Sequence, residues 1–241
     1  MNIIKAENYD EMSHMAARKI IEKVRINPKI TLGLATGSTP IGVYKKLIED
    51  HKTNGTTYKQ VTTVNLDEYS GIDRNDPNSY HYFMCEQLFN HIDIPHEQTY
   101  IPDGMAKDLQ LECSRFESVV QKLGGVDVQL LGIGHNGHIG FNEPGTSFKS
   151  RTHVVALTES TRKANARFFP SIEDVPAHAI TMGIATIMES KEIILLASGT
   201  SKAEAIARLV NGEVNEDFPA SLLKLHNNVT IIADKDALQL V

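Results

Sequence analysis

Five apolar runs, rich in β-branched and aliphatic residues, recur along the chain at 30–35, 61–66, 126–133, 192–197 and 229–233. Their apolar residues are nearly continuous, which is typical of strands buried on both faces. Between the runs, apolar residues recur three or four positions apart and predict helices at 40–52, 80–91, 109–123 and 201–210. Because strands and helices alternate, the sequence predicts an α/β fold with a mostly parallel central sheet.

We expect a Rossmann-like fold of three layers, in which helices flank the sheet, and a single domain over residues 1–241. No internal repeat or linker-like run of Gly, Ser or Pro divides the chain. The segment 158–178 carries Arg162, Lys163 and Arg167 and an aromatic break at Pro170. We interpret this segment as an excursion between strands that forms a small lid.

Composition narrows the class of protein. The chain has 41% hydrophobic and 22% charged residues and no apolar run near the roughly 20 residues needed to cross a bilayer, so a soluble protein with no membrane partner is expected. Two cysteines and an N-terminus without a basic and apolar leader favour the cytoplasm. A net charge of -6 argues against nucleic acid as a partner, so an anionic ligand would need a local cluster of cations.

The most informative stretch is LGIGHNGHIGFNEPG at 131–145, directly behind one of the predicted strands. Glycine lets the backbone approach a ligand where a Cβ atom would clash, so this stretch predicts the floor of an active site. We expect His138 to exchange protons with a substrate while Asn136 and Glu143 orient it. A metal site is not expected, because the glycines disfavour the helix that would place His135 and His138 on one face.

A second candidate site follows the predicted strand at 30–35. Its hydroxyl groups and backbone N–H groups would converge on an anion at the start of a helix. The residues concerned are Thr36, Gly37, Ser38 and Thr39. Taken alone, the stretch fits a capped helix start equally well, and it has the spacing of neither a P-loop nor a dinucleotide site. Arg167 and Lys202 add two cations, which together with the hydroxyl groups describe a phosphate site.

Adjacent carboxylates at Asp67 and Glu68 end the predicted strand at 61–66. Consecutive strand residues point to opposite faces, so at most one of them is expected to face a ligand. An acidic residue that caps the next turn is the alternative. Beside an anion-binding loop, a buried aspartate is a usable proton shuttle, which makes Asp67 a candidate base.

These residues belong to blocks in which the chain resembles the glucosamine-6-phosphate deaminases of amino-sugar catabolism. The blocks cover nearly the whole chain and lie at 33–40, 65–69, 132–145, 150–152, 161–169 and 198–202. The resemblance implies conversion of glucosamine 6-phosphate and water to fructose 6-phosphate and ammonia by an aldose–ketose isomerisation coupled to deamination. It also implies that neither a metal nor an organic cofactor takes part.

The resemblance also implies roles for single residues. Asp67 resembles the base that moves a proton from C2 to C1, and His138 resembles the group that opens the pyranose ring, with Glu143 as its partner. The residues at the family's phosphate-binding positions are Thr36, Gly37, Ser38, Thr39, Arg167 and Lys202. The segment 158–178 falls where the family has a lid.

Two departures from the family pattern carry expectations. Many members have Asp where this chain has Asn136, and the variant Asn136→Asp is expected to favour the protonated form of His138. Members activated by N-acetylglucosamine 6-phosphate have basic side chains where this chain has His153 and Val155. We therefore expect weak or absent activation by that effector, and a monomer or small homo-oligomer.

Two alternative functions are kept. A 6-phosphogluconolactonase would share the fold and a related glycine–histidine loop, but it needs no base at C2; the continuation Phe141 to Pro144 and the block at Asp67 favour the deaminase. A non-catalytic sugar-phosphate sensor would carry an N-terminal helix-turn-helix. The first buried strand, expected near Ile30, leaves no room for one.

Overall fold

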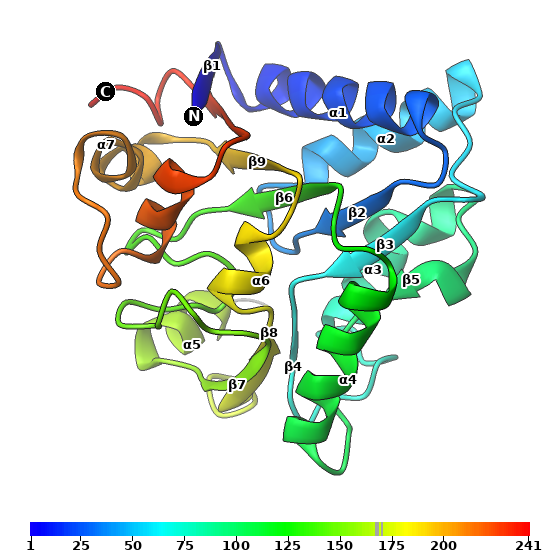
Figure 1. Cartoon of the computed structure of the whole chain (residues 1–241), viewed down its shortest axis with the longest axis vertical. Coiled ribbons are helices and arrows are strands. Elements are labelled where there is room, and N and C mark those ends of the chain that lie inside the picture. The colour runs from blue at the N-terminus through cyan, green and yellow to red at the C-terminus, as the bar shows by residue number, and fades with distance from the viewer. Residues whose placement is uncertain (167–168, 170) are drawn as a thin grey trace.

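A seven-stranded parallel sheet forms the centre of the fold (Figure 1). The computed structural model describes residues 1–166, 169 and 171–241. The strand order is β1-β10-β9-β6-β2-β3-β5, and all six pairings between these strands are parallel. The strands are β1 (Asn2–Ala6), β2 (Thr31–Leu34), β3 (Thr62–Asn65), β5 (Thr99–Tyr100), β6 (Val128–Gly132), β9 (Glu192–Ala197) and β10 (Val229–Asp234). The five strands predicted from apolar runs are all present.

Helices cover both faces of this sheet and complete the predicted three layers. One face packs against α1 (Tyr9–Ile26), α2 (Ile41–Asn54) and α3 (Tyr80–Gln87). The other packs against α4 (Leu109–Lys122), α6 (Ile184–Met188), α7 (Ala203–Asn211) and the 3-10 helix η5 (Pro219–Leu225). Shorter 3-10 turns are η1 (Phe89–His91), η2 (His96–Gln98) and η4 (Thr200–Lys202). Among the described residues, no helix has the length and apolar character needed to span a membrane.

Strand β9 shows why the sequences of the central strands are continuously apolar. Ile194 and Leu196 face the layer of α1 and α2, whereas Ile193 and Leu195 face the layer of α7, and all four are buried. Alternate side chains of one strand therefore fill two different cores. Such burial on both sides removes the polar positions that would otherwise mark a strand.

A second, smaller sheet lies beside the main one and was not predicted. It joins β4 (Asp67–Tyr69), β8 (His178–Thr181) and β7 (His153–Ala156), and both of its pairings are antiparallel. Helix α5 (Glu159–Asn165) lies in the stretch between β7 and β8 (Figure 1). The predicted excursion at 158–178 thus leaves from one strand of this small sheet and returns to another.

Candidate active site

A cavity of about 730 Å³ lies at the carboxyl ends of β2, β6 and β9, and β4 contributes to its wall. Parallel strands present their following loops at one edge of a sheet, which is where open α/β sheets bind ligands. The predicted residues that line it are Thr36, Gly37, Ser38, Thr39, Asp67, Asn136, His138 and Lys202. Three loops that are distant in sequence therefore meet at one site.

The loop after β2 lacks the side-chain cap that was the alternative interpretation of its hydroxyl groups. Helix α2 begins after Pro40, and neither Ser38 nor Thr39 caps it. Gly37 adopts a φ of 91°, a left-handed conformation that glycine tolerates without strain. No described residue accepts a hydrogen bond from the backbone N–H groups of Gly37, Ser38 and Thr39. These groups are therefore available to an anionic ligand.

Lys202 approaches the same cavity from the turn η4 after β9. Its Nζ atom donates a 2.7 Å hydrogen bond to the carbonyl oxygen of Ile133, at the end of the β6 segment. This bond uses one of the three ammonium donors and fixes the position of the charge. Burial lowers the pKa of Lys202 below its usual value, because the charged form is poorly solvated there.

Asp67 and Glu68 point to different surroundings, as the alternation of a strand requires. Asp67 lines the cavity with 7% of its surface exposed, and burial, assisted by the charge of Glu68, raises its pKa to about 8. Glu68 faces the start of α3, where its carboxylate accepts the N–H groups of Tyr80 and His81, each at 2.9 Å. Burial outweighs these bonds and raises the pKa of Glu68 to about 7. Of the two adjacent carboxylates, only Asp67 lines the cavity, as the alternation of a strand predicts.

His138 and Glu143 form a pair whose Nδ1 and Oε1 atoms are 3.6 Å apart. The other carboxylate oxygen accepts a 2.6 Å bond from the amide of Asn136. The hydroxyl group of Thr161, on α5, donates a 2.5 Å bond to Oε1. Burial by itself would raise the pKa of Glu143, but the His138 ring at 3.6 Å and the hydrogen bonds from Thr161 and Asn136 lower it to about 2. Glu143 is therefore an ionised carboxylate behind the imidazole.

Gly134 makes the position of the imidazole possible. A Cβ atom on this residue would overlap the His138 ring, so only glycine leaves room for it. The backbone closes the loop with a 2.9 Å bond from the N–H of Gly134 to the carbonyl of His138. His135, three residues before His138, is exposed at the rim of the cavity.

Two aromatic side chains that line the cavity were not predicted from the sequence. Tyr80 and Phe141 line the cavity with nearly parallel rings 6.0 Å apart, and the ring of Tyr69 lies 4.8 Å from that of Tyr80. Burial raises the pKa of Tyr80 well above its ordinary value, so its hydroxyl group stays protonated. The sequence could have indicated Tyr80, because it begins the helix that follows the strand of Asp67 and Ser79 precedes it as a capping residue.

The last predicted phosphate-binding residue, Arg167, lies outside the described residues. The part of the predicted lid that the structure does describe reaches the site through Thr161, which lines the cavity. Arg162, by contrast, donates to the carbonyl oxygens of Ile172 and Val175 within the same excursion. Its role in the described segment is to hold the excursion together.

The cavity combines a buried carboxylate, an imidazole beside a second carboxylate and a loop whose N–H groups have no acceptor among the described residues, an arrangement suited to an enzyme that moves protons on a small anionic substrate. Comparison with known sequences supplies the family. The sequence profile of the glucosamine-6-phosphate isomerases/6-phosphogluconolactonase family matches residues 5–232, and the chain belongs to this family.

Within the family, the chain is similar to proteins named as deaminases. It is 61% identical to the glucosamine-6-phosphate deaminase of Geobacillus sp. (strain WCH70) over 100% of this chain and 96% of that protein. It is 55% identical to glucosamine-6-phosphate deaminase 1 of Bacillus subtilis (strain 168), over 100% and 99% of the two chains.

Solved structures agree with this placement. A structure described as a monomeric glucosamine-6-phosphate deaminase superposes with a TM-score of 0.98 at 54% identity, over 100% of both chains. The 6-phosphogluconolactonase of Trypanosoma brucei superposes with a TM-score of 0.78 at 22% identity, over 99% of this chain and 97% of that one. The second likeness shows a shared fold alone.

Proposed function

We propose that this chain is a glucosamine-6-phosphate deaminase, which converts glucosamine 6-phosphate and water to fructose 6-phosphate and ammonia. The observation that carries the proposal is the meeting of Asp67 and the His138–Glu143 pair in one cavity with an anion-binding loop. Full-length relatives at 55% to 61% identity bear the same name. Overall the reaction hydrolyses a C–N bond, which places the enzyme among the hydrolases.

Ring opening is the first step of the proposed mechanism. His138 removes the proton of the C1 hydroxyl group and gives it to the ring oxygen as the bond between that oxygen and C1 breaks. Glu143, ionised and held by Thr161 and Asn136, orients the imidazole and stabilises its protonated form. The product of this step is the open-chain aldehyde of the amino sugar.

Proton transfer follows at the opened chain. Asp67 takes the proton from C2 while the C1 oxygen gains a proton from the substrate's own amino group, which gives an enolamine; Asp67 then returns its proton to C1, which gives an imine at C2. A carboxylate of ordinary pKa is a weak base for this step, whereas burial has raised the pKa of Asp67 to about 8, close to the operating pH. Water then adds to the imine, and ammonia leaves.

The phosphate end of the substrate occupies the other part of the cavity. The proposed ligands are the loop residues Thr36, Gly37, Ser38 and Thr39 together with Arg167 and Lys202. Cations and aligned N–H groups favour a dianion, in a chain whose net charge is -6. We propose that the segment 158–178 closes over the bound sugar as a lid, which excludes water during proton transfer.

The choice between deaminase and lactonase rests on the base. A lactonase needs only the activation of water, whereas the deaminase also needs a base at C2, the role proposed for Asp67 in the cavity wall. The test is a coupled assay of the purified protein that follows ammonia and fructose 6-phosphate. Release of both in equal amounts from glucosamine 6-phosphate is expected. Hydrolysis of 6-phosphogluconolactone without ammonia release from the amino sugar would replace the proposal with the lactonase.

The proposal extends to assembly, location and cofactors. We propose a cytoplasmic enzyme that works as a monomer or small oligomer, needs no metal ion, and responds weakly or not at all to N-acetylglucosamine 6-phosphate. A solved relative is itself described as monomeric. Light scattering gives the mass, dialysis against a chelator should leave turnover unchanged, and sigmoidal kinetics removed by the effector would contradict the regulatory part.

A further inference from the structure

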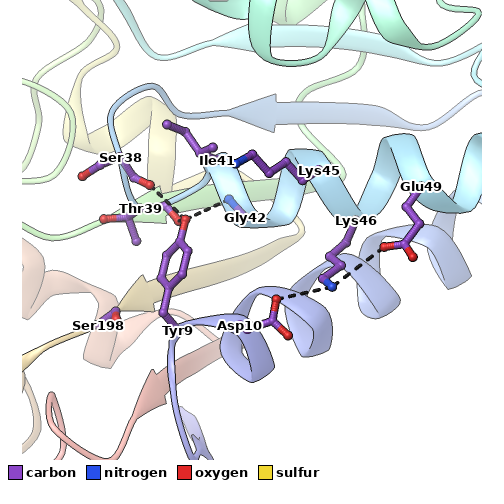
Figure 2. Close-up of a pocket in the computed structure, with 10 residues that line it drawn as sticks. All are labelled: Tyr9, Asp10, Ser38, Thr39, Ile41, Gly42, Lys45, Lys46, Glu49 and Ser198. Carbon is purple, nitrogen blue, oxygen red and sulfur yellow. Dashed lines mark hydrogen bonds and ion pairs between the residues drawn. The ribbon is translucent and has the colours of Figure 1, made fainter.

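The hydroxyl group of Tyr9, the first residue of α1, bonds to the loop that follows β2 (Figure 2). It donates to the carbonyl oxygens of Ser38 at 3.0 Å and Thr39 at 3.1 Å, which share its single proton. It also accepts the N–H of Gly42 at 2.8 Å. One side chain therefore ties a distant helix to both ends of a turn that lines the candidate active site.

The turn is a partition between two cavities. Ser38 and Thr39 line the candidate active site and also a second cavity of about 570 Å³, which Tyr9 borders on the outer side. Figure 2 shows the phenol reaching the turn from α1, while Lys46 on α2 lies between Asp10 and Glu49. Tyr9 lines this second cavity and not the candidate active site, so it holds the turn from outside the site.

Because a peptide is planar, the bond to the Ser38 carbonyl also fixes the direction of the Thr39 N–H group. In a trans peptide the C=O and N–H groups point in opposite directions. Because the carbonyl of Ser38 points to Tyr9, the N–H of Thr39 points away from Tyr9, and Thr39 lines the candidate active site. That N–H has no acceptor among the described residues, so an anion in the cavity can accept it.

The packing around Tyr9 keeps it in place for this role. The hydroxyl group of Ser13 donates a 2.7 Å bond to the carbonyl of Tyr9 one turn earlier on α1. A Cβ atom at Gly42 would run into Ser13 and approach the Tyr9 ring, so glycine is what lets α1 and α2 come close enough for the bonds to form. The contact is therefore built into both helices.

From this geometry we infer that Tyr9 is a positioning residue for phosphate binding, which holds the Ser38–Thr39 peptide with its N–H toward the substrate phosphate. The inference rests on the proposed function for the identity of the ligand. It adds a residue outside the cavity, which acts through the loop rather than by touching the substrate.

The test compares Tyr9→Phe with Tyr82→Phe, since the two tyrosines are similarly exposed, at 38% and 37%. Loss of the hydroxyl group at Tyr9 is expected to raise KM for glucosamine 6-phosphate and the dissociation constant of inorganic phosphate together, by about tenfold, with kcat nearly unchanged. Tyr82→Phe should change none of these. Thermal unfolding of both variants shows whether each is folded at the assay temperature.

Several outcomes overturn the inference. They are an unchanged KM and phosphate affinity in Tyr9→Phe, a fall in kcat alone, or a lower unfolding temperature with normal ligand binding, which would indicate a purely structural role. Calorimetric binding of inorganic phosphate does not depend on turnover. If Tyr9→Phe weakens the binding of inorganic phosphate but the wild type releases no ammonia, the proposed function fails while this inference stands.

Discussion

The amide group of Asn136 donates a 2.6 Å hydrogen bond to the carboxylate of Glu143, and its own oxygen accepts the backbone N–H of His138 at 3.3 Å. An amide can serve both partners because it carries a donor and an acceptor. It therefore connects the backbone of the imidazole residue with the carboxylate behind it. A change at Asn136 is therefore expected to affect both His138 and Glu143.

The variant Asn136→Asp tests that connection. A carboxylate at this position would face Glu143 without a proton to donate, so the pair would retain a shared proton to higher pH and would also favour the protonated form of His138. Both effects move the acid limb of the kcat/KM profile upward, by about one pH unit or more. A pH–rate profile that coincides with that of the wild type would show that the amide has no such role.

Thr161 is expected to support catalysis through Glu143. The variant Thr161→Val keeps the shape of the side chain but removes the 2.5 Å bond to Oε1. We predict a fall in kcat/KM of about tenfold, because a hydrogen bond to a charged group is lost. The control Thr161→Ser retains the hydroxyl group and should stay within about twofold of the wild type on the same reasoning. Equal losses in both variants would instead point to packing of α5.

Gly134→Ala should displace the imidazole without touching its chemistry. The added methyl group would occupy the space of the His138 ring, so turnover should fall. The control is a double-mutant cycle with His138→Gln. If the methyl group acts only through the imidazole, then adding Gly134→Ala to His138→Gln costs no further activity. Additive losses would mean that Gly134 matters for another reason, such as the course of the loop.

Asp67 should lower the stability of the fold at the pH where it works. Because burial raises its pKa to about 8, the folded protein binds more protons than the unfolded chain above the ordinary pKa of 3.8, and stability declines as pH rises toward 8. The variant Asp67→Asn removes this cost. It should therefore be more stable than the wild type at pH 8, by roughly 1 to 5 kcal/mol, and nearly equal to it at pH 4.

Denaturant unfolding at both pH values measures the difference. A gap between variant and wild type that is the same at pH 4 and pH 8 would mean that the ionisation of Asp67 does not contribute. A gap that widens with pH would confirm that the fold holds this carboxyl group in an unfavourable environment. Such a cost is common at sites where function sets the choice of residue.

Much of the fold was predictable from the sequence, because its main strands are buried on both faces. The run at 192–197 coincides with β9, and the run at 229–233 falls one residue short of β10. The gathering of Asp67, His138 and Lys202 at one sheet edge was also predictable, since strand ends in a parallel sheet carry their loops to the same side.

The second sheet was not predictable in the same way. Strands β4, β7 and β8 have three or four residues each, and β7 is only half-buried, so no continuous apolar run marks them. Asp67 was consequently placed at the end of a main-sheet strand, whereas it begins β4 and pairs in register with Thr181. Strand β4 pairs with β8, more than 100 residues further along the chain, and such distant pairing leaves no trace in the local pattern.

The capping of α2 and the placement of Tyr80 in the cavity also depend on residues that are distant in the sequence. A cap of α2 by the hydroxyl groups of Ser38 and Thr39 was one interpretation of the sequence, but the first turn of that helix is instead served by the phenol of Tyr9. Likewise, Tyr80 reaches the cavity because Glu68 binds the backbone at the start of α3. Both arrangements join segments that the sequence keeps apart, so local propensity could not reveal them.

The most direct test of the account is proton transfer by Asp67, followed by deuterium incorporation at C1 when the reaction runs in deuterated water. The wild type should release ammonia and place deuterium at C1 of fructose 6-phosphate. Asp67→Asn should do neither, with a loss of at least about 100-fold, while still binding the unreactive open-chain analogue glucitol 6-phosphate with wild-type affinity. Substantial turnover with labelled product in Asp67→Asn would contradict the central claim.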